Sequence, residues 1–221
     1  MSRLPAAVLF DMDGTLVDTE PVWDQALRQL ARQLGGELSE AARRATVGTN
    51  VPVSVDIVRA DVGRPHADPA ELGERLVAAV RDRLAEGVQW RAGARQLVGA
   101  VRGAGVPTAL VTNTERSLVQ LIFGPLLGRL FDVSVCGDEV RRSKPDPEPY
   151  WTAASLLGVD PADTVAIEDS PAGATSAESA GCAVLVVPAA VLVPAGPRRT
   201  FARSLVEVGV ADLDVLFRRA A

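Results

Sequence analysis

Residues 6–15 read AAVLFDMDGT, an apolar run of strand length that stops at an aspartate and passes into a polar turn. A strand that is apolar at every position is typical of a parallel sheet buried on both faces. Further strand patterns follow at residues 108–111, 133–135, 164–167 and 183–187. Helical patterns alternate with them at residues 93–104, 117–123, 147–157, 171–180 and 213–219. This alternation predicts an α/β protein whose parallel sheet is covered by helices.

The segment between the first two strands has a different pattern, because only helical spacing occurs there. Helices are predicted at residues 21–34, 40–47, 53–62 and 69–86. We therefore predict a Rossmann-like, doubly wound core domain formed by residues 1–17 and 89–221. A small all-helical cap of residues 18–88 is inserted after its first strand. Residues 188–197 are rich in proline and alanine and are expected to form a surface loop.

The composition excludes several classes of protein. The 221 residues carry a formal net charge of −5, which does not support binding to nucleic acid or to a membrane surface. One histidine, His66, and two cysteines, Cys136 and Cys182, are too few for a Cys/His zinc cluster or a disulfide framework. No apolar stretch approaches the roughly 18–20 residues of a membrane helix. We expect a cytoplasmic protein, monomeric rather than oligomeric.

Polar side chains follow the predicted strands at the point where each strand ends. They are Asp11, Asp13, Thr112, Asn113, Lys144, Glu168 and Asp169. Because ligands of such sheets bind beyond the carboxyl ends of the strands, these side chains are expected to meet in one crevice. A single Asp or Asn in such a place is commonly a helix N-cap. Four acidic side chains together, however, are costly unless a cation accompanies them.

The types of side chain in this set favour a magnesium site that binds a phosphoryl group. Oxygen ligands without histidine or thiolate favour a hard cation, and Mg²⁺ typically takes only a few carboxylates. A cation, a lysine, a hydroxyl and an amide together suit the charge of a phosphoryl group, and a carboxylate can serve as the nucleophile. Of the 23 basic residues, only Lys144 is a lysine. Two explanations of this single lysine are open. Either the position needs a compact point charge, or a coding bias toward arginine has left one lysine by chance.

Four short motifs carry a resemblance to a known family. Residues 11–20, DMDGTLVDTE, resemble the first motif of the haloacid dehalogenase superfamily of phosphohydrolases. The family's second motif is matched by VTNT at residues 111–114. Its third is matched by KPDP at residues 144–147, and its fourth by IEDS at residues 167–170. They occur in the family's order, so the resemblance covers nearly the whole chain. The position of the cap, together with TEPVW at residues 19–23, is similar to the β-phosphoglucomutase-like and sugar-phosphate phosphatase branch.

This resemblance implies the roles of the acidic residues. Asp11 would attack phosphorus, become phosphorylated and ligate Mg²⁺. Asp13 would protonate the leaving oxygen, later deprotonate the attacking water, and offer its backbone carbonyl to the metal. Asp169 would ligate Mg²⁺, and Glu168 would do so directly or through a water molecule.

The resemblance also implies that Thr112, Asn113 and Lys144 hold the phosphoryl oxygens. In the cap, Glu20 and Asn50 are candidates for contact with the substrate. Trp23 is a third candidate, with the cap core as its alternative place. The pair Arg43-Arg44 is expected to lie on a solvated face.

The implied function is Mg²⁺-dependent hydrolysis of a small phosphorylated metabolite, a sugar or polyol monophosphate. A phosphomutase is the alternative. The resemblance argues against it, because β-phosphoglucomutases share an arginine at the position where this chain has Val51. The cap has no lysine, although Arg75, Arg81 or Arg83 could substitute. Dehalogenase chemistry and a non-catalytic binding module are less favoured, because the first motif keeps both of its aspartates.

Overall fold

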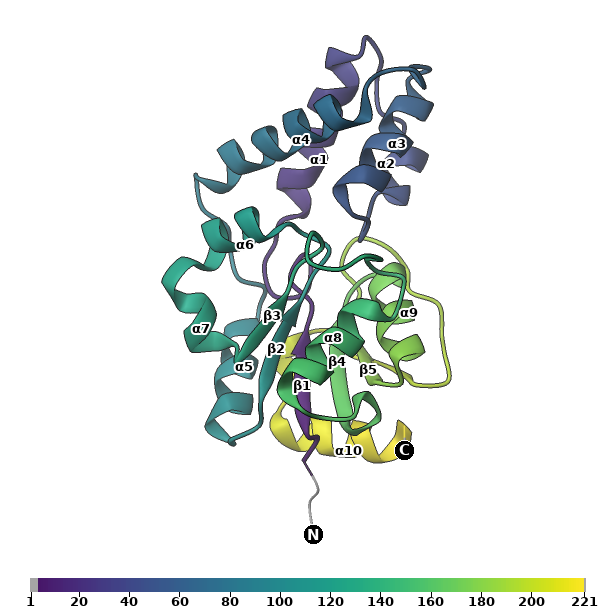
Figure 1. The fold of residues 1–221 in the computed structure, drawn as a ribbon. Coiled ribbons are helices and arrows are strands. Elements are labelled where there is room, and N and C mark those ends of the chain that lie inside the picture. The colour runs from purple at the N-terminus through teal and green to yellow at the C-terminus, as the bar shows by residue number, and fades with distance from the viewer. Residues whose placement is uncertain (1–3, 221) are drawn as a thin grey trace.

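A six-stranded parallel sheet forms the centre of the protein in the computed structural model, which describes residues 4–220 (Figure 1). Its strands are β1 (Ala7–Phe10), β2 (Thr108–Val111), β3 (Val133–Val135), β4 (Thr164–Glu168), β5 (Ala183–Val186) and β6 (Arg199–Phe201). They are arranged in the order β3-β2-β1-β4-β5-β6, and every neighbouring pair is parallel. The chain reverses direction across the sheet at β1, so a topological switch point lies between β1 and β4. The predicted fold class is confirmed.

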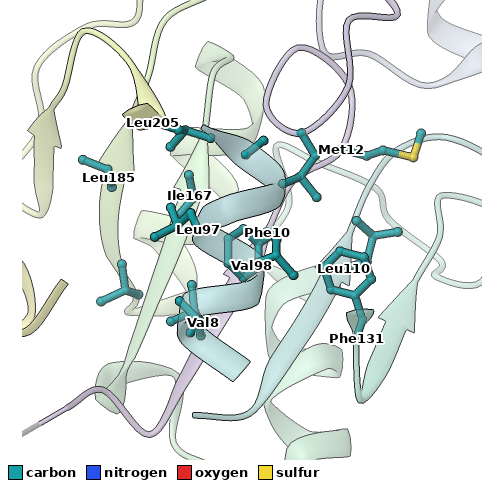
Figure 2. Packing of buried hydrophobic residues seen from close by; sticks show 14 of the residues in the cluster. Val8, Phe10, Met12, Leu97, Val98, Leu110, Phe131, Ile167, Leu185 and Leu205 are labelled. Atoms are coloured by element: carbon teal, nitrogen blue, oxygen red, sulfur yellow. The ribbon is translucent and has the colours of Figure 1, made fainter. Parts of the chain in front are cut away.

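Helices cover both faces of the sheet because the strands are apolar on both sides. Val8 and Phe10 of β1 face one layer, and Figure 2 shows them packed with Leu97 and Val98 of α5 (Ala94–Gly103) and with Ile167 of β4. The helix α10 (Val210–Ala220) joins this layer. The alternate residues of β1 face the second layer, formed by α8 (Glu148–Leu157) and α9 (Pro171–Ala180).

Four helices lie between β1 and α5 in the chain and beyond the carboxyl edge of the sheet (Figure 1). They are α1 (Glu20–Gln33), α2 (Glu40–Ala45), α3 (Val51–Asp61) and α4 (Pro69–Leu84), and we call them the cap. Their buried side chains form a separate hydrophobic cluster, which Leu118 of α6 (Arg116–Phe123) joins from the core. The cap therefore has its own interior and rests on α6.

The structure contains several short elements that were not predicted. The strand β6 was not predicted because its three residues, RTF, form no apolar run, and it is a partly exposed edge strand. The short helix α7 (Leu127–Leu130) was also missed, as were the 3₁₀ turns η1 (Gly124–Leu126), η2 (Pro161–Asp163) and η3 (Leu205–Glu207). Residues 188–197 contain no helix or strand, as predicted. None of the helices within residues 4–220 is both long and apolar enough to cross a membrane.

Candidate active site

The turn after β1 brings the first motif against the end of β4. Gly14 has a φ of +75°, a left-handed conformation that glycine adopts without strain. A Cβ atom at this position would lie 2.2 Å from Oδ2 of Asp169. Glycine is therefore required twice, by the backbone conformation and by the close approach of the Asp169 carboxylate.

Lys144 lies buried between two carboxylates. Its Nζ donates hydrogen bonds to Oδ1 of Asp11 at 2.7 Å, to Oε1 of Glu168 at 2.6 Å and to the carbonyl oxygen of Val111 at 2.8 Å. Burial acts to lower the pKa of Lys144, but the two carboxylates outweigh it and hold the pKa above its ordinary value. The side chain is therefore an ammonium ion with all three of its protons in hydrogen bonds.

Three buried carboxylates are close enough to share a cation. One oxygen from each of Asp11, Glu168 and Asp169 lies within 4.8 Å of the others. Burial, and then the charge of Glu168, raise the pKa of Asp11 to about 7, although Lys144 opposes this. Burial and the charge of Asp11 likewise raise the pKa of Asp169 well above its ordinary value. Oδ2 of Asp11 is buried without a hydrogen-bond partner. The carboxylate oxygens of this cluster repel one another, and one of them is a buried acceptor without a donor. Both features fit a site for a hard divalent cation.

Asp13 is held by four donors. Its Oδ2 accepts hydrogen bonds from the hydroxyls of Thr112 at 3.2 Å and Thr114 at 2.7 Å. Its Oδ1 accepts from the hydroxyl of Thr19 at 2.6 Å and from Nε1 of Trp23, in the cap, at 3.2 Å. Trp23 therefore reaches Asp13 and does not only pack in the cap core. Thr19 and Thr114 were not predicted, although both stand within the motifs quoted from the sequence.

Two asparagine side chains join the cap to the core. The Nδ2 of Asn113 donates to the carbonyl oxygens of Gly48 and Lys144, and its Oδ1 accepts from the backbone N–H of Lys144. The Nδ2 of Asn50 donates to the hydroxyl of Ser143 at 2.7 Å, and its Oδ1 caps α3. Both amides are thus engaged by protein partners, and Asn50 is not among the residues that line the cavity described next.

A small cavity lies between the cap and the carboxyl edge of the sheet, with a volume of about 40 Å³. The core side is lined by Asp11, Asp13, Thr112, Asn113, Thr114, Lys144, Asp169 and Ser170. The cap side is lined by Glu20, Trp23, Leu27, Arg43, Thr46, Gly48, Thr49 and Ser54. This volume holds only a few water molecules, so the cap in this arrangement leaves no room for a larger ligand.

The prediction that Arg43 is solvated was wrong. Its side chain is buried against α1, where Nε donates to Oδ1 of Asp24 at 2.9 Å and Nη2 donates to Oε2 of Glu20 at 2.5 Å. Its Nη1 also contacts the hydroxyl of Thr46 at 3.3 Å. Arg44, the next residue, is exposed, because adjacent residues of a helix point in different directions. The six residues of α2 are too few to show which face is buried.

The sequence left three arginines of α4 as candidates for binding a second phosphate. Within the described part of the chain, none of them lines this cavity. Arg75 is paired with Glu71. Arg83 donates to Gln29 and to a carbonyl oxygen of its own helix. Arg81 lines a separate surface groove between α3 and α4.

Comparisons with known proteins agree with the four motifs. The model of the haloacid dehalogenase-like hydrolases matches residues 5–181. The chain is 33% identical over 181 residues to a phosphorylated carbohydrates phosphatase of Thermotoga maritima, covering 79% of this chain and 81% of that protein. It is 31% identical over 187 residues to hexitol phosphatase B of Escherichia coli K12, covering 83% of each.

A solved structure extends this likeness over almost all of the fold. The crystal structure of a variant of CbbY from Rhodobacter sphaeroides, in complex with xylulose-(1,5)bisphosphate, superposes with a TM-score of 0.81. The two chains are 29% identical, and the alignment covers 96% of this chain and all of that one. The family model and the relatives confirm the resemblance predicted from the sequence, and the chain belongs to the haloacid dehalogenase-like hydrolase family.

Proposed function

We propose that the protein is a phosphatase that hydrolyses the monoester of a small sugar or polyol phosphate, with Mg²⁺, through a phosphoaspartate on Asp11. The observation that carries this proposal is Oδ2 of Asp11, a buried carboxylate oxygen without a partner, beside the ammonium of Lys144. Lys144 holds the other oxygen of the same carboxylate, which fixes the orientation of the nucleophile.

The chemistry then runs in two halves. In the first, an oxygen of Asp11 forms a bond to phosphorus and the bond from phosphorus to the leaving oxygen breaks. Asp13 gives a proton to that oxygen, and to carry this proton it must first lose one of the four donors that hold it here. In the second, Asp13 accepts a proton from water as the water oxygen attacks phosphorus, and the carboxylate of Asp11 is released. The hydroxyl of Thr112, which follows β2, donates to Asp13 here and would turn its proton to a phosphoryl oxygen when substrate binds.

Asp11 and Asp169 are the side chains that would hold Mg²⁺, with Glu168 as a direct or water-mediated partner. When bound, the ion supplies positive charge that offsets the repulsion of the carboxylates and stabilises charge on the phosphoryl oxygens. The backbone carbonyl of Asp13 is the further ligand that the family resemblance implies.

The charges of the cap favour a phosphatase over a phosphomutase. A mutase must hold the second phosphate of a bisphosphate, which requires free cations in the cap. Arg43 lines the cavity, but Glu20 and Asp24 neutralise it, and Val51 is buried in the cap interior. The hydroxyls of residues 46, 49 and 54 suit a neutral body that carries hydroxyl groups. The Thermotoga maritima and Escherichia coli relatives, named as phosphatases of carbohydrates and hexitols, support the same substrate class.

A screen of phosphate release from small phosphorylated metabolites, with and without Mg²⁺, tests the proposal. We expect Mg²⁺-dependent hydrolysis of sugar or polyol monophosphates, and no stimulation by a sugar bisphosphate. Efficient conversion of β-glucose 1-phosphate to glucose 6-phosphate, with little free phosphate, would establish a mutase instead. Full activity after exhaustive chelation would exclude the metal. We further propose that the enzyme acts as a cytoplasmic monomer on this metabolite, without nucleic acid.

A further inference from the structure

A tyrosine that the reaction scheme does not use lies directly beneath the site. Tyr150 of α8 is completely buried, and its hydroxyl donates a hydrogen bond to Oε1 of Glu168 at 2.5 Å. Burial, followed by the charge of Glu168, raises the pKa of Tyr150 well above its ordinary value of 10, so the hydroxyl keeps its proton. Its ring lies beneath the ammonium of Lys144, with Nζ 5.2 Å from the ring centroid.

Lys144 has no proton to spare for a phosphoryl group. Its three protons point to Asp11, to Glu168 and to the carbonyl oxygen of Val111. To bind a phosphoryl oxygen, the ammonium must give up one of these acceptors. The hydrogen bond to Asp11 orients the nucleophile, so its loss would disturb the reaction. The hydrogen bond to Val111 satisfies a buried carbonyl oxygen, so its loss would leave that oxygen without this donor. Oε1 of Glu168 is the acceptor that already has a second donor, the hydroxyl of Tyr150.

Water has little room to replace that second donor. Glu168 is completely buried, and its carboxylate is packed against the first turn of α9. A Cβ atom at Gly173 would lie 1.9 Å from Oε2 and 2.1 Å from Oε1. The nearest other side-chain donor, the hydroxyl of Ser170, is 3.4 Å from Oε2 and does not reach Oε1. Without the hydroxyl of Tyr150, an Oε1 that Lys144 has left would be a buried carboxylate oxygen with no side-chain donor, which is costly.

We propose that Tyr150 is a positioning residue that allows Lys144 to exchange Glu168 for a phosphoryl oxygen of the substrate. The hydroxyl of Tyr150 stays on Oε1 of Glu168 while the ammonium turns toward the phosphoryl group. Tyr150 touches neither substrate nor metal and acts only through Glu168. This inference rests on the proposed phosphatase function, and it adds a residue for which the four motifs give no role.

The chain allows a direct test, because Lys144 is its only lysine and Tyr150 is its only tyrosine. Labelling lysine with ¹⁵N and the tyrosine ring with ¹³Cζ therefore gives one NMR signal from each side chain. Inorganic phosphate is titrated into the unaltered protein with Mg²⁺ present. We expect both signals to shift with the same dissociation constant, because Tyr150 becomes the sole side-chain donor to Oε1 of Glu168 when Lys144 leaves that oxygen. A lysine signal that moves while the tyrosine signal stays constant would overturn the proposal.

Tyr150→Phe removes only the hydroxyl and keeps the buried ring. We expect kcat to fall about tenfold, the amount that one hydrogen bond to a charged group supplies, and the phosphate-induced shift of the lysine signal to shrink. Trp151→Phe is the matched control. It removes a donor of the same helix, the indole N–H of Trp151, which binds the carbonyl oxygen of Ala180 away from the site. This control should keep the wild-type kcat and shift.

Two results would refute the role of Tyr150. One is a Tyr150→Phe enzyme with the wild-type kcat, and the other is a slow variant whose lysine signal responds to phosphate as in the wild type. The second result would mean that the hydroxyl only stabilises the fold. Failure of the proposed function has a different signature, because the wild-type enzyme would then release no phosphate from any substrate. The labelled signals do not depend on turnover.

Discussion

Replacement of Asp11 by asparagine should abolish phosphate release and, in the absence of Mg²⁺, make the protein more stable. Burial and Glu168 raise the pKa of Asp11 from 3.8 to about 7. Above pH 7 the charged form therefore costs about 4 kcal/mol of folding free energy, at 1.4 kcal/mol for each pKa unit. The attraction of Lys144 is already contained in this pKa. Asparagine cannot carry the charge, so the variant does not bear this cost.

The magnitude can be converted into a melting temperature. Relaxation of the neighbouring side chains in the wild type reduces the cost, and half of it, about 2 kcal/mol, corresponds to a rise in Tm of about 4–8 °C for a chain of this size. The cost is absent below pH 3.8 and grows as the pH rises to the folded-state pKa of about 7. At pH 5 it is about two fifths of its value at pH 8, and the gain in Tm should shrink accordingly.

The assay is thermal unfolding followed by circular dichroism in EDTA, at pH 8 and at pH 5. Asp132→Asn is the matched control, because hydrogen bonds from Thr108 and Arg102 outweigh burial and lower the pKa of Asp132, so its loss should lower Tm. Added Mg²⁺ should raise the Tm of the wild type more than that of Asp11→Asn, since the variant lacks a ligand. A variant that melts at or below the wild-type temperature in EDTA at pH 8 would refute this account of the cluster.

Three further predictions concern the cap contact to Asp13, the glycine beside Glu168 and the choice of metal ion. Trp23→Phe removes the donor that the cap offers to Asp13 and keeps an aromatic ring; we expect steady-state kinetics to show kcat lower by about tenfold with a smaller change in KM. Gly173→Ala would push a Cβ atom into the carboxylate of Glu168 and should lower Tm and kcat together, whereas Gly99→Ala, with open space in α5, should raise Tm. Ca²⁺ should replace Mg²⁺ poorly in phosphate release, because it prefers six to eight oxygen ligands and the site offers few.

Burial of every residue made four of the strands easy to predict from the sequence. The strands β1, β2, β4 and β5 are buried along their whole length, and each appears in the sequence as an apolar run. The edge strand β6 is exposed on one side and carries an arginine and a threonine in three residues. Its place is fixed by pairing with β5, a contact between distant segments that local periodicity does not encode.

The candidate site divides in the same way. Residues at the ends of strands could be predicted to converge, because parallel strands all end at one edge. The contacts of Arg43 with Glu20 and Asp24 depend on how two cap helices pack, and a helix of six residues carries too little periodicity to reveal its buried face. Tyr150 follows Lys144 by six residues, and its contact with Glu168 depends on how α8 lies against β4. Side-chain contacts between elements decide these positions.

The single lysine can now be explained by geometry. Coding bias alone would leave a surviving lysine at an arbitrary and usually solvated position, because lysine is almost never fully buried unless it is paired. Lys144 is only 4% exposed, and its Nζ has three acceptors between 2.6 and 2.8 Å from that one atom. A guanidinium spreads its donors over a rigid planar fork and cannot direct three of them from one point. Arginine serves this chain at every other basic position, but in this pocket only a compact ammonium reaches Asp11, Glu168 and the carbonyl of Val111 together.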